Sequence, residues 1–182
     1  IGMVEVPDWR LQRLTELVHP KKTVPTTFEF TDIAGIVKGA SKGEGLGNQF
    51  LSHIRQVDAI CHVVRCFDDD NITHVEGRVD PLEDIDTINL ELVLADLESI
   101  NKRYTRVAKV AKTKDKDAVA ELAVLDKIKP VLEEGKSART IEFTEEEQKI
   151  VKSLFLLTTK PILYVANVSE DDVADADANH YV

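Results

Sequence analysis

An acidic residue and a glycine lie three positions apart where a strand-like segment ends. Residues 26–33 alternate between polar and apolar side chains and include Asp32, and Gly35 follows directly. At the carboxyl end of a buried strand, an aspartate can hold Mg²⁺ through water, and a glycine lets its backbone N–H approach a terminal phosphate closely. Because D-x-x-G is a short pattern, an ordinary turn from a strand into a loop explains it equally well.

A second polar motif, Asn167-Val168-Ser169-Glu170, follows the last strand-like segment at 160–168. Open parallel sheets bind ligands beyond the carboxyl ends of their strands, so we expect this motif to share a crevice with Asp32. Guanine-specific switches carry N-K-x-D here, whereas this chain has Val168 and Glu170 in the Lys and Asp positions. A longer acid and a lost stacking lysine weaken guanine recognition, because unpaired buried polar groups penalise binding. The motif therefore favours adenine.

The segments around these motifs predict an α/β fold. Residues 1–6 and 9–18 read as a strand and an amphipathic helix in which Trp9 is a core position, and 46–57 read as a second helix. The strand-like segments 59–67 and 160–168 are apolar on both faces, which is typical of a parallel sheet covered by helices on both sides. We expect a mainly parallel sheet.

The residues between the last two strands predict an antiparallel helical hairpin, or coiled coil, interrupted at 113–117. Apolar residues recur near heptad spacing in both arms, at Leu90, Leu94, Leu97 and Tyr104 and at Leu122, Leu125, Ile128 and Leu132. A basic run falls at the expected tip and consists of Lys102, Arg103, Arg106, Lys109, Lys112, Lys114 and Lys116, with Asp115 as its single acid. This run is either a contact for RNA phosphates or a solvated charged end.

Composition limits the remaining classes of function. The 182 residues are 43% hydrophobic and 31% charged, as in a folded globular protein, and no apolar run is long enough to cross a membrane. A net charge of −10 disfavours non-specific attraction of the whole chain to nucleic acid or to anionic lipid. Cys61 and Cys66 lie five apart in one strand, on opposite faces, so we expect reduced thiols and no zinc site.

Taken together, the motifs resemble the YchF/Obg-like ATPases. The resemblance runs through the whole chain and includes the glycine-rich stretch 32–48, the strand 61–67, the segment 74–81 and the motif 167–170. It implies a translation-factor-class P-loop fold, Mg²⁺-dependent hydrolysis of ATP in preference to GTP, a coiled-coil insertion, association with ribosomes and a cytoplasmic location. By position, Asp32 resembles the Mg²⁺-linked acid, Gly35 the glycine that contacts the γ-phosphate, and Asn167, Val168, Ser169 and Glu170 the base-recognition motif.

The same resemblance suggests where a catalytic group could lie. Ile36 follows D-x-x-G, where many switch GTPases have a glutamine that positions water, and isoleucine cannot orient water. In bacterial members a histidine placed like His74 fulfils that role. The alternative is an ordinary surface histidine.

The departures from the family are equally specific. No G-x-x-x-x-G-K-[ST] signature is present, so the P-loop and, after Val182, a TGS-type domain are expected outside this chain. Residues 1–88 and 151–182 are then two parts of the nucleotide domain, and 89–150 the helical insertion. We expect this fragment alone to be inactive. A GTPase of the same fold, and a largely non-catalytic ribosome- or RNA-binding scaffold, are the alternatives.

Overall fold

The computed structural model describes residues 1–33, 39, 51–69, 71–72 and 77–182. The chain forms two compact units, Ile1–Gly35 and Ile36–Val182, and each unit is described by itself.

The first unit is a strand, a helix and a second strand. Strands β1 (Gly2–Glu5) and β2 (Thr27–Phe30) pair antiparallel, and helix α1 (Trp9–Val18) connects them. Asp8 begins the helix by accepting a hydrogen bond from the backbone N–H of Arg10 at 2.9 Å. The predicted core position of Trp9 is wrong, since its side chain is 77% exposed. Among the described residues of this unit, no further layer covers the helix.

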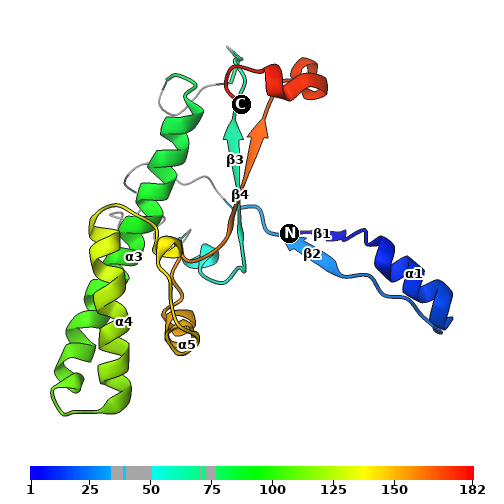
Figure 1. Ribbon diagram of the computed structural model, residues 1–182. Coiled ribbons are helices and arrows are strands. Elements are labelled where there is room, and N and C mark those ends of the chain that lie inside the picture. Colours follow the sequence, from blue (N-terminus) through cyan, green and yellow to red (C-terminus); the bar gives the residue numbers. More distant parts are fainter. Residues whose placement is uncertain (34–38, 40–50, 70, 73–76) are drawn as a thin grey trace. The chain divides into compact units, whose positions relative to one another are not determined.

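The second unit contains the predicted parallel pair. Strand β3 (Ile60–Arg65) lies beside β4 (Ile162–Asn167), with His62 opposite Tyr164 (Figure 1). The face that carries Tyr164 is turned toward helix α3 (Pro81–Ala111), because the Tyr164 hydroxyl lies 3.1 Å from Asn89 Nδ2. Parallel strands need a long connection between them, and helix α3 forms part of the connection from β3 to β4.

The opposite face of this pair is open among the described residues. Val63 is 60% exposed and Leu163 65% exposed, whereas we expected helices on both faces. Helix α3 packs against this pair on the Tyr164 face, and β1 and β2 form a separate antiparallel pair. The fold is therefore mixed α/β, with one parallel pair and two long packed helices.

The predicted hairpin consists of α3 and α4 (Lys116–Glu133), which run antiparallel (Figure 1). Asp80 and Asp115 begin the two helices by accepting hydrogen bonds from backbone N–H groups in the first turns. The hairpin core includes the predicted residues of α4, together with Leu97 and Tyr104 of α3.

The predicted register of α3 is partly wrong. Leu90 is 48% exposed, and the buried heptad positions are instead Val93, Ile100 and Val107. Helix α3 carries apolar residues around much of its circumference near its start, so leucine spacing alone does not select the face that meets α4.

Residues 51–54, within the helix predicted at 46–57, are helical, and three shorter elements follow the hairpin. A 3₁₀ turn, η2 (Ala138–Thr140), precedes α5 (Glu145–Leu154), and a second one, η3 (Glu170–Ala178), follows β4. Helix α5 begins with a capping box in which the Thr144 hydroxyl and the Glu147 carboxylate accept hydrogen bonds from each other's backbone N–H. None of the described helices combines the length and the apolar composition that a membrane span requires.

Candidate nucleotide site at the ends of the parallel strands

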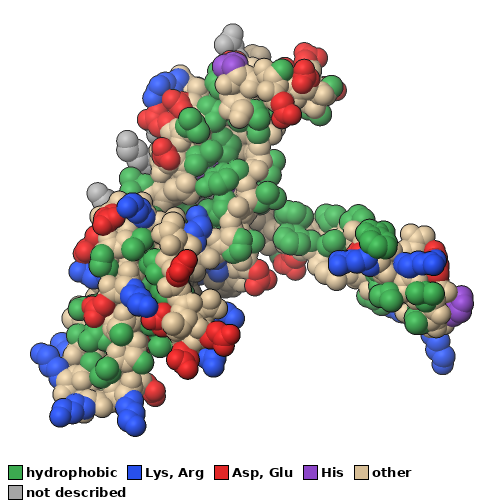
Figure 2. All heavy atoms as spheres, in the orientation of Figure 1, with side chains coloured by type: hydrophobic (Ala, Val, Ile, Leu, Met, Phe, Trp, Pro, Cys, Tyr) green, Lys and Arg blue, Asp and Glu red, His purple; other side chains and the backbone are tan. Residues whose placement is uncertain are grey.

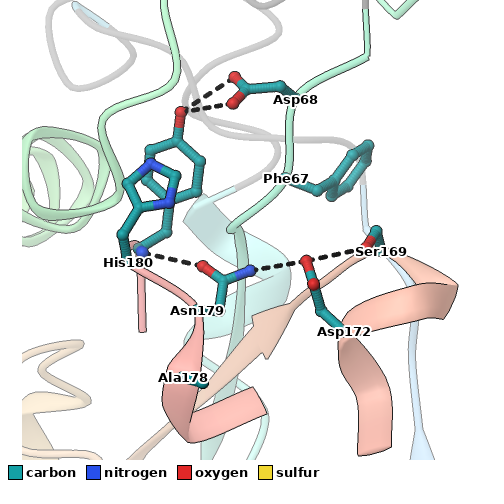
Figure 3. A pocket seen from close by; sticks show the side chains of 8 residues that line it. Phe67, Asp68, Ser169, Asp172, Ala178, Asn179 and His180 are labelled. Atoms are coloured by element: carbon teal, nitrogen blue, oxygen red, sulfur yellow. Dashed lines mark hydrogen bonds between the residues drawn. The ribbon is translucent and has the colours of Figure 1, made fainter. Parts of the chain in front are cut away.

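The carboxyl ends of β3 and β4 meet at one edge of the second unit. Arg65 lies opposite Asn167, and the next backbone N–H, that of Cys66, donates a hydrogen bond of 2.7 Å to the Asn167 carbonyl. A cavity of about 310 Å³ opens at this edge (Figure 3). Its lining consists of Phe67, Asp68, Ser169, Asp172, Ala178, Asn179, His180 and Tyr181.

A chain of hydrogen bonds crosses one side of this cavity, as the dashed lines in Figure 3 show. Ser169 Oγ donates to Asp172 Oδ2 at 2.8 Å, and Asn179 Nδ2 donates to the same oxygen at 3.0 Å. The Asn179 amide also donates to the Cys66 carbonyl at 3.2 Å and accepts from the Tyr181 backbone N–H at 2.8 Å. These bonds attach residues 179–181 to the end of β3, more than 110 residues earlier in the chain.

Aromatic rings and a carboxylate occupy the other side. The Tyr181 hydroxyl donates to both oxygens of Asp68, at 2.9 and 2.8 Å, and this hydrogen bond raises the pKa of Tyr181. The rings of His180 and Tyr181 lie with centroids 3.8 Å apart, and the Arg65 guanidinium lies 4.7 Å from the Phe67 ring centroid. The lining is mainly polar, and aromatic rings beside carboxylate oxygens can hold a planar heterocycle that carries amino groups.

The predicted base-recognition residues lie at this edge. Asn167 is the exposed last residue of β4, Val168 and Ser169 are half-buried, and Glu170 is the exposed first residue of η3. Ser169 lines the cavity, whereas the other three stand beside it without lining it.

The predicted phosphate and metal residues come earlier in the chain. Asp32 follows β2 in the first unit, is exposed, and has no hydrogen bond to any residue described. Gly35 and His74 lie outside the described residues. The crevice shared by Asp32 and Asn167 therefore stays a prediction, as do the roles of all these residues.

Sequence reasoning missed most of the cavity. Phe67 and Asp68 carry a usable signal, because they come at and just after the end of the predicted strand 59–67. Residues 179–181 carry none, since only the tertiary bond from Asn179 to Cys66 brings them to this edge.

A second charged feature lies at the far end of the hairpin. Lys102 pairs with Glu98, and Arg103 pairs with Glu121. The remaining cations of the run are exposed and have no ion pair with a described residue: Arg106, Lys109, Lys112, Lys114 and Lys116. Figure 2 shows Lys and Arg side chains gathered at the end of the hairpin. Lys114 has a φ of 61°, in the left-handed region that favours glycine.

Known proteins match the chain over its whole length. Residues 11–95 match the family described as 50S ribosome-binding GTPase. The chain is 74% identical to the ribosome-binding ATPase YchF of Bacillus subtilis over 182 residues, which are all of this chain and 50% of that protein. It is 56% identical to the ribosome-binding ATPase YchF of Escherichia coli O157:H7 over 93% of this chain and 47% of that protein.

A solved structure agrees with these sequence matches. The YchF GTPase of Schizosaccharomyces pombe superimposes with a TM-score of 0.79 at 43% identity, over 98% of this chain and 49% of that one. The chain thus spans about half the length of the relatives it matches. Identity of this extent, together with the matching fold and motifs, places the chain in the YchF family.

Proposed function

We propose that this chain is the part of a ribosome-associated, ATP-hydrolysing switch that supplies the base-recognition edge and the ribosome-facing hairpin. The observation that carries the proposal is the cavity at the ends of β3 and β4, next to Asn167–Glu170. Its volume lies at the lower end of the range for small-molecule sites. The ribosome-binding ATPase names of the bacterial relatives agree with it.

The proposed base preference is adenine over guanine. Val168 cannot stack as a lysine does, and Glu170 is one methylene longer than the aspartate that pairs with guanine. The names of the relatives divide on this point, since the fission-yeast structure and the family description both say GTPase. A GTPase of the same fold is therefore the second candidate.

Competition between ATP and GTP for the full-length protein separates these two candidates. We expect ATP to displace a fluorescent ATP analogue at lower concentration than GTP. The double substitution Val168→Lys with Glu170→Asp should move the preference toward GTP by about tenfold or more, since a well-formed polar contact discriminates strongly. Val173→Lys, at an exposed position of η3, is the matched control and should leave the preference unchanged. An unchanged preference in the double variant would contradict the base-site assignment.

We assign Mg²⁺ coordination, through water, to Asp32 and γ-phosphate contact to Gly35. Among the described residues there is no cluster of three His, Cys, Asp or Glu side chains that could enclose a metal ion. Mg²⁺ fits a single exposed carboxylate nevertheless, because it keeps several waters and takes its other ligands from nucleotide phosphates. Asp32→Asn should therefore weaken the Mg²⁺ dependence of nucleotide binding, measured by titration of the full-length protein.

His74 is the proposed catalytic group, since Ile36 cannot orient a water molecule. A positioned general base typically contributes about 10²- to 10⁴-fold to a rate, so His74→Ala should reduce turnover by that order while nucleotide affinity holds. Unchanged turnover would leave His74 an ordinary surface residue.

We assign ribosome contact to the five unpaired cations of the hairpin end. Exposed lysines and arginines without acidic partners bind nucleic-acid phosphates and release counterions, which makes binding strongly dependent on salt. The same surface would serve a largely non-catalytic scaffold, the third candidate, in which nucleotide only tunes affinity.

Lys114 offers a test that unfolding cannot imitate. Lys114→Gly removes a charge and also relieves the backbone strain of a lysine with a φ of 61°. The variant should therefore be more stable by about 1 kcal/mol but bind ribosomes more weakly. Adding Lys109→Gln and Lys112→Gln should lower the slope of log affinity against log salt by about 0.7 to 0.9 for each phosphate that the protein no longer neutralises. Lys136→Gln, outside the hairpin, is the control. If the variant with all three substitutions still sediments with ribosomes as the unsubstituted protein does, the assignment is wrong.

The remaining features of the full protein follow from the same proposal. We infer that the parallel pair belongs to a larger P-loop sheet, whose helices cover the open face that carries Val63 and Leu163. The phosphate-binding loop then lies in a part of the protein outside this chain. We place the protein in the cytoplasm, where its ribosome partner lies.

A further inference from the structure

Gly39, in the glycine-rich stretch of the sequence, contacts a buried carboxylate of the hairpin. The backbone N–H of Gly39 donates to Glu91 Oε1 of α3 at 2.6 Å, and Glu91 is only 4% exposed. The carboxylate is buried although Gly39 itself is exposed, and a hydrogen bond to a charged acceptor is stronger than one to a neutral acceptor. Gly39 has a φ of 86°, and this backbone shape suits glycine, so the contact depends on the local conformation around Gly39 and not on a side chain there.

Arg55, which follows the glycine-rich stretch, makes a second attachment to the same helix. Its guanidinium donates to Asp96 Oδ1 at 3.3 Å, to Ser99 Oγ at 3.1 Å and to the Ala95 carbonyl at 3.4 Å, all on α3. It also donates to the carbonyl of Phe155, at the end of α5, at 2.9 Å. One side chain therefore joins the segment around Arg55 to α3 and to the end of α5.

The two attachments contact α3 between residues 91 and 99, near the middle of the helix, and this region is the base of the arm that ends at the basic residues. From Glu91 to its end at Ala111, α3 rises about 30 Å at about 1.5 Å per residue. A tilt of about 5° at the base would move the basic end by about 3 Å, comparable to known helix shifts in switching proteins. Tight packing of α3 against α4 lets the two arms move together.

We propose that Glu91 and Arg55 are positioning residues that couple the nucleotide site to the hairpin, so that bound nucleotide changes the orientation of the basic end. The inference rests on the proposed nucleotide site and on the sequence position of Gly39, which lies in the glycine-rich stretch that follows Asp32. By linkage, the same coupling lets a partner at the hairpin end change nucleotide affinity by the same factor.

The test uses the full-length protein and hydrogen exchange along 91–111, with and without a non-hydrolysable ATP analogue. Glu91→Met removes the acceptor at similar volume, Glu91→Gln keeps an acceptor oxygen, and Arg55→Met removes the second attachment. Glu98→Met, at an exposed position of the same helix, is the matched control. Thermal unfolding and a titration with the analogue accompany each variant, and Arg55→Met replaces Glu91→Met if the latter does not fold.

In the unsubstituted protein we expect the analogue to change exchange rates along α3 by about fivefold or more, in the range of common coupling factors. The effect should vanish in Glu91→Met and Arg55→Met and persist in Glu91→Gln and Glu98→Met. All four variants should bind the analogue with an affinity within about twofold of that of the unsubstituted protein. Bound analogue without any change along α3, or a full effect in both Met variants, would overturn the coupling. Failure of the unsubstituted protein to bind the analogue would instead refute the proposed nucleotide site, and with it the coupling.

Discussion

Asp96 accepts four hydrogen bonds from described residues, and replacing it by asparagine is a sharp test of how the hairpin base is held. Asp96 is fully buried, and each of its oxygens accepts two hydrogen bonds. Oδ1 accepts from the backbone N–H of Leu157 at 2.9 Å and from Arg55, while Oδ2 accepts from the backbone N–H and the hydroxyl of Thr158, both at 2.8 Å. Asp96→Asn keeps the shape but places an NH₂ group against one of these donor pairs.

The size of the effect follows from which donor loses its acceptor. If the NH₂ replaces Oδ2, the Thr158 hydroxyl can rotate and accept, but the Thr158 backbone N–H remains unpaired. If it replaces Oδ1, the Leu157 N–H and Arg55 both lose their acceptor. A buried unpaired donor costs about 1 to 3 kcal/mol, and each hydrogen bond that loses its charged acceptor is weakened as well. We therefore expect Asp96→Asn to lower the free energy of unfolding by about 2 to 5 kcal/mol.

Thermal and urea unfolding of the whole chain, followed by circular dichroism, measure this change. For a chain of this size, about 2 to 5 kcal/mol corresponds to a decrease in Tm of about 4 to 20 °C. Asp86→Asn is the matched control, because Asp86 is exposed on the same helix and surface substitutions usually stay within about 0.5 kcal/mol. If both variants unfold at the same temperature, the Asp96 network does not stabilise the unit and the reasoning fails.

Three further predictions follow from the same contacts. Ile128→Ala, at a fully buried position of the hairpin, should cost about 2 to 5 kcal/mol in urea unfolding, and a smaller loss would mean that the core collapses around the gap. The hydrogen bond from Lys127 lowers the pKa of Glu147, so its contribution to stability exists at neutral pH and is lost as the pH falls below about 4.5. Glu147→Gln should therefore destabilise the chain more at pH 7 than in acid, and an equal loss at neutral and acid pH would contradict this. Burial raises the pKa of Cys66, which is 2% exposed, whereas Cys61 is exposed, so a thiol reagent should modify Cys61 first in the folded chain and both equally in urea.

The exposed apolar residues of the parallel pair illustrate how sequence and structure answer different questions. Val63 and Leu163 look like core residues in the sequence, because their strands are apolar on both faces. In the described residues only the Tyr164 face meets a helix. Apolar residues on both faces of a strand indicate that both faces are suited to burial. Whether a helix covers each face depends on which other segments are present.

Much of the local structure could be predicted from the sequence alone. The parallel pair and the helical hairpin with its turn near 113–117 follow from periodicity and from turn residues. The position of Asn167–Glu170 at the end of β4 follows from the polar residues after that strand, whereas its role in base recognition stays a prediction. Helix starts such as that at Thr144 depend on residues three positions apart, and those near neighbours are present whatever the rest of the chain does.

Only the tertiary structure decided which residues share a buried space. The α3 register settled on Val93, Ile100 and Val107, and Asp96 became a buried acceptor because Leu157, 61 residues later, returns to it. Residues 179–181 reached the strand ends through Asn179 in the same way. Periodicity and helix caps depend on residues a few positions apart in the sequence. Long-range contacts form only when folding brings distant donors and acceptors together and excludes water from between them.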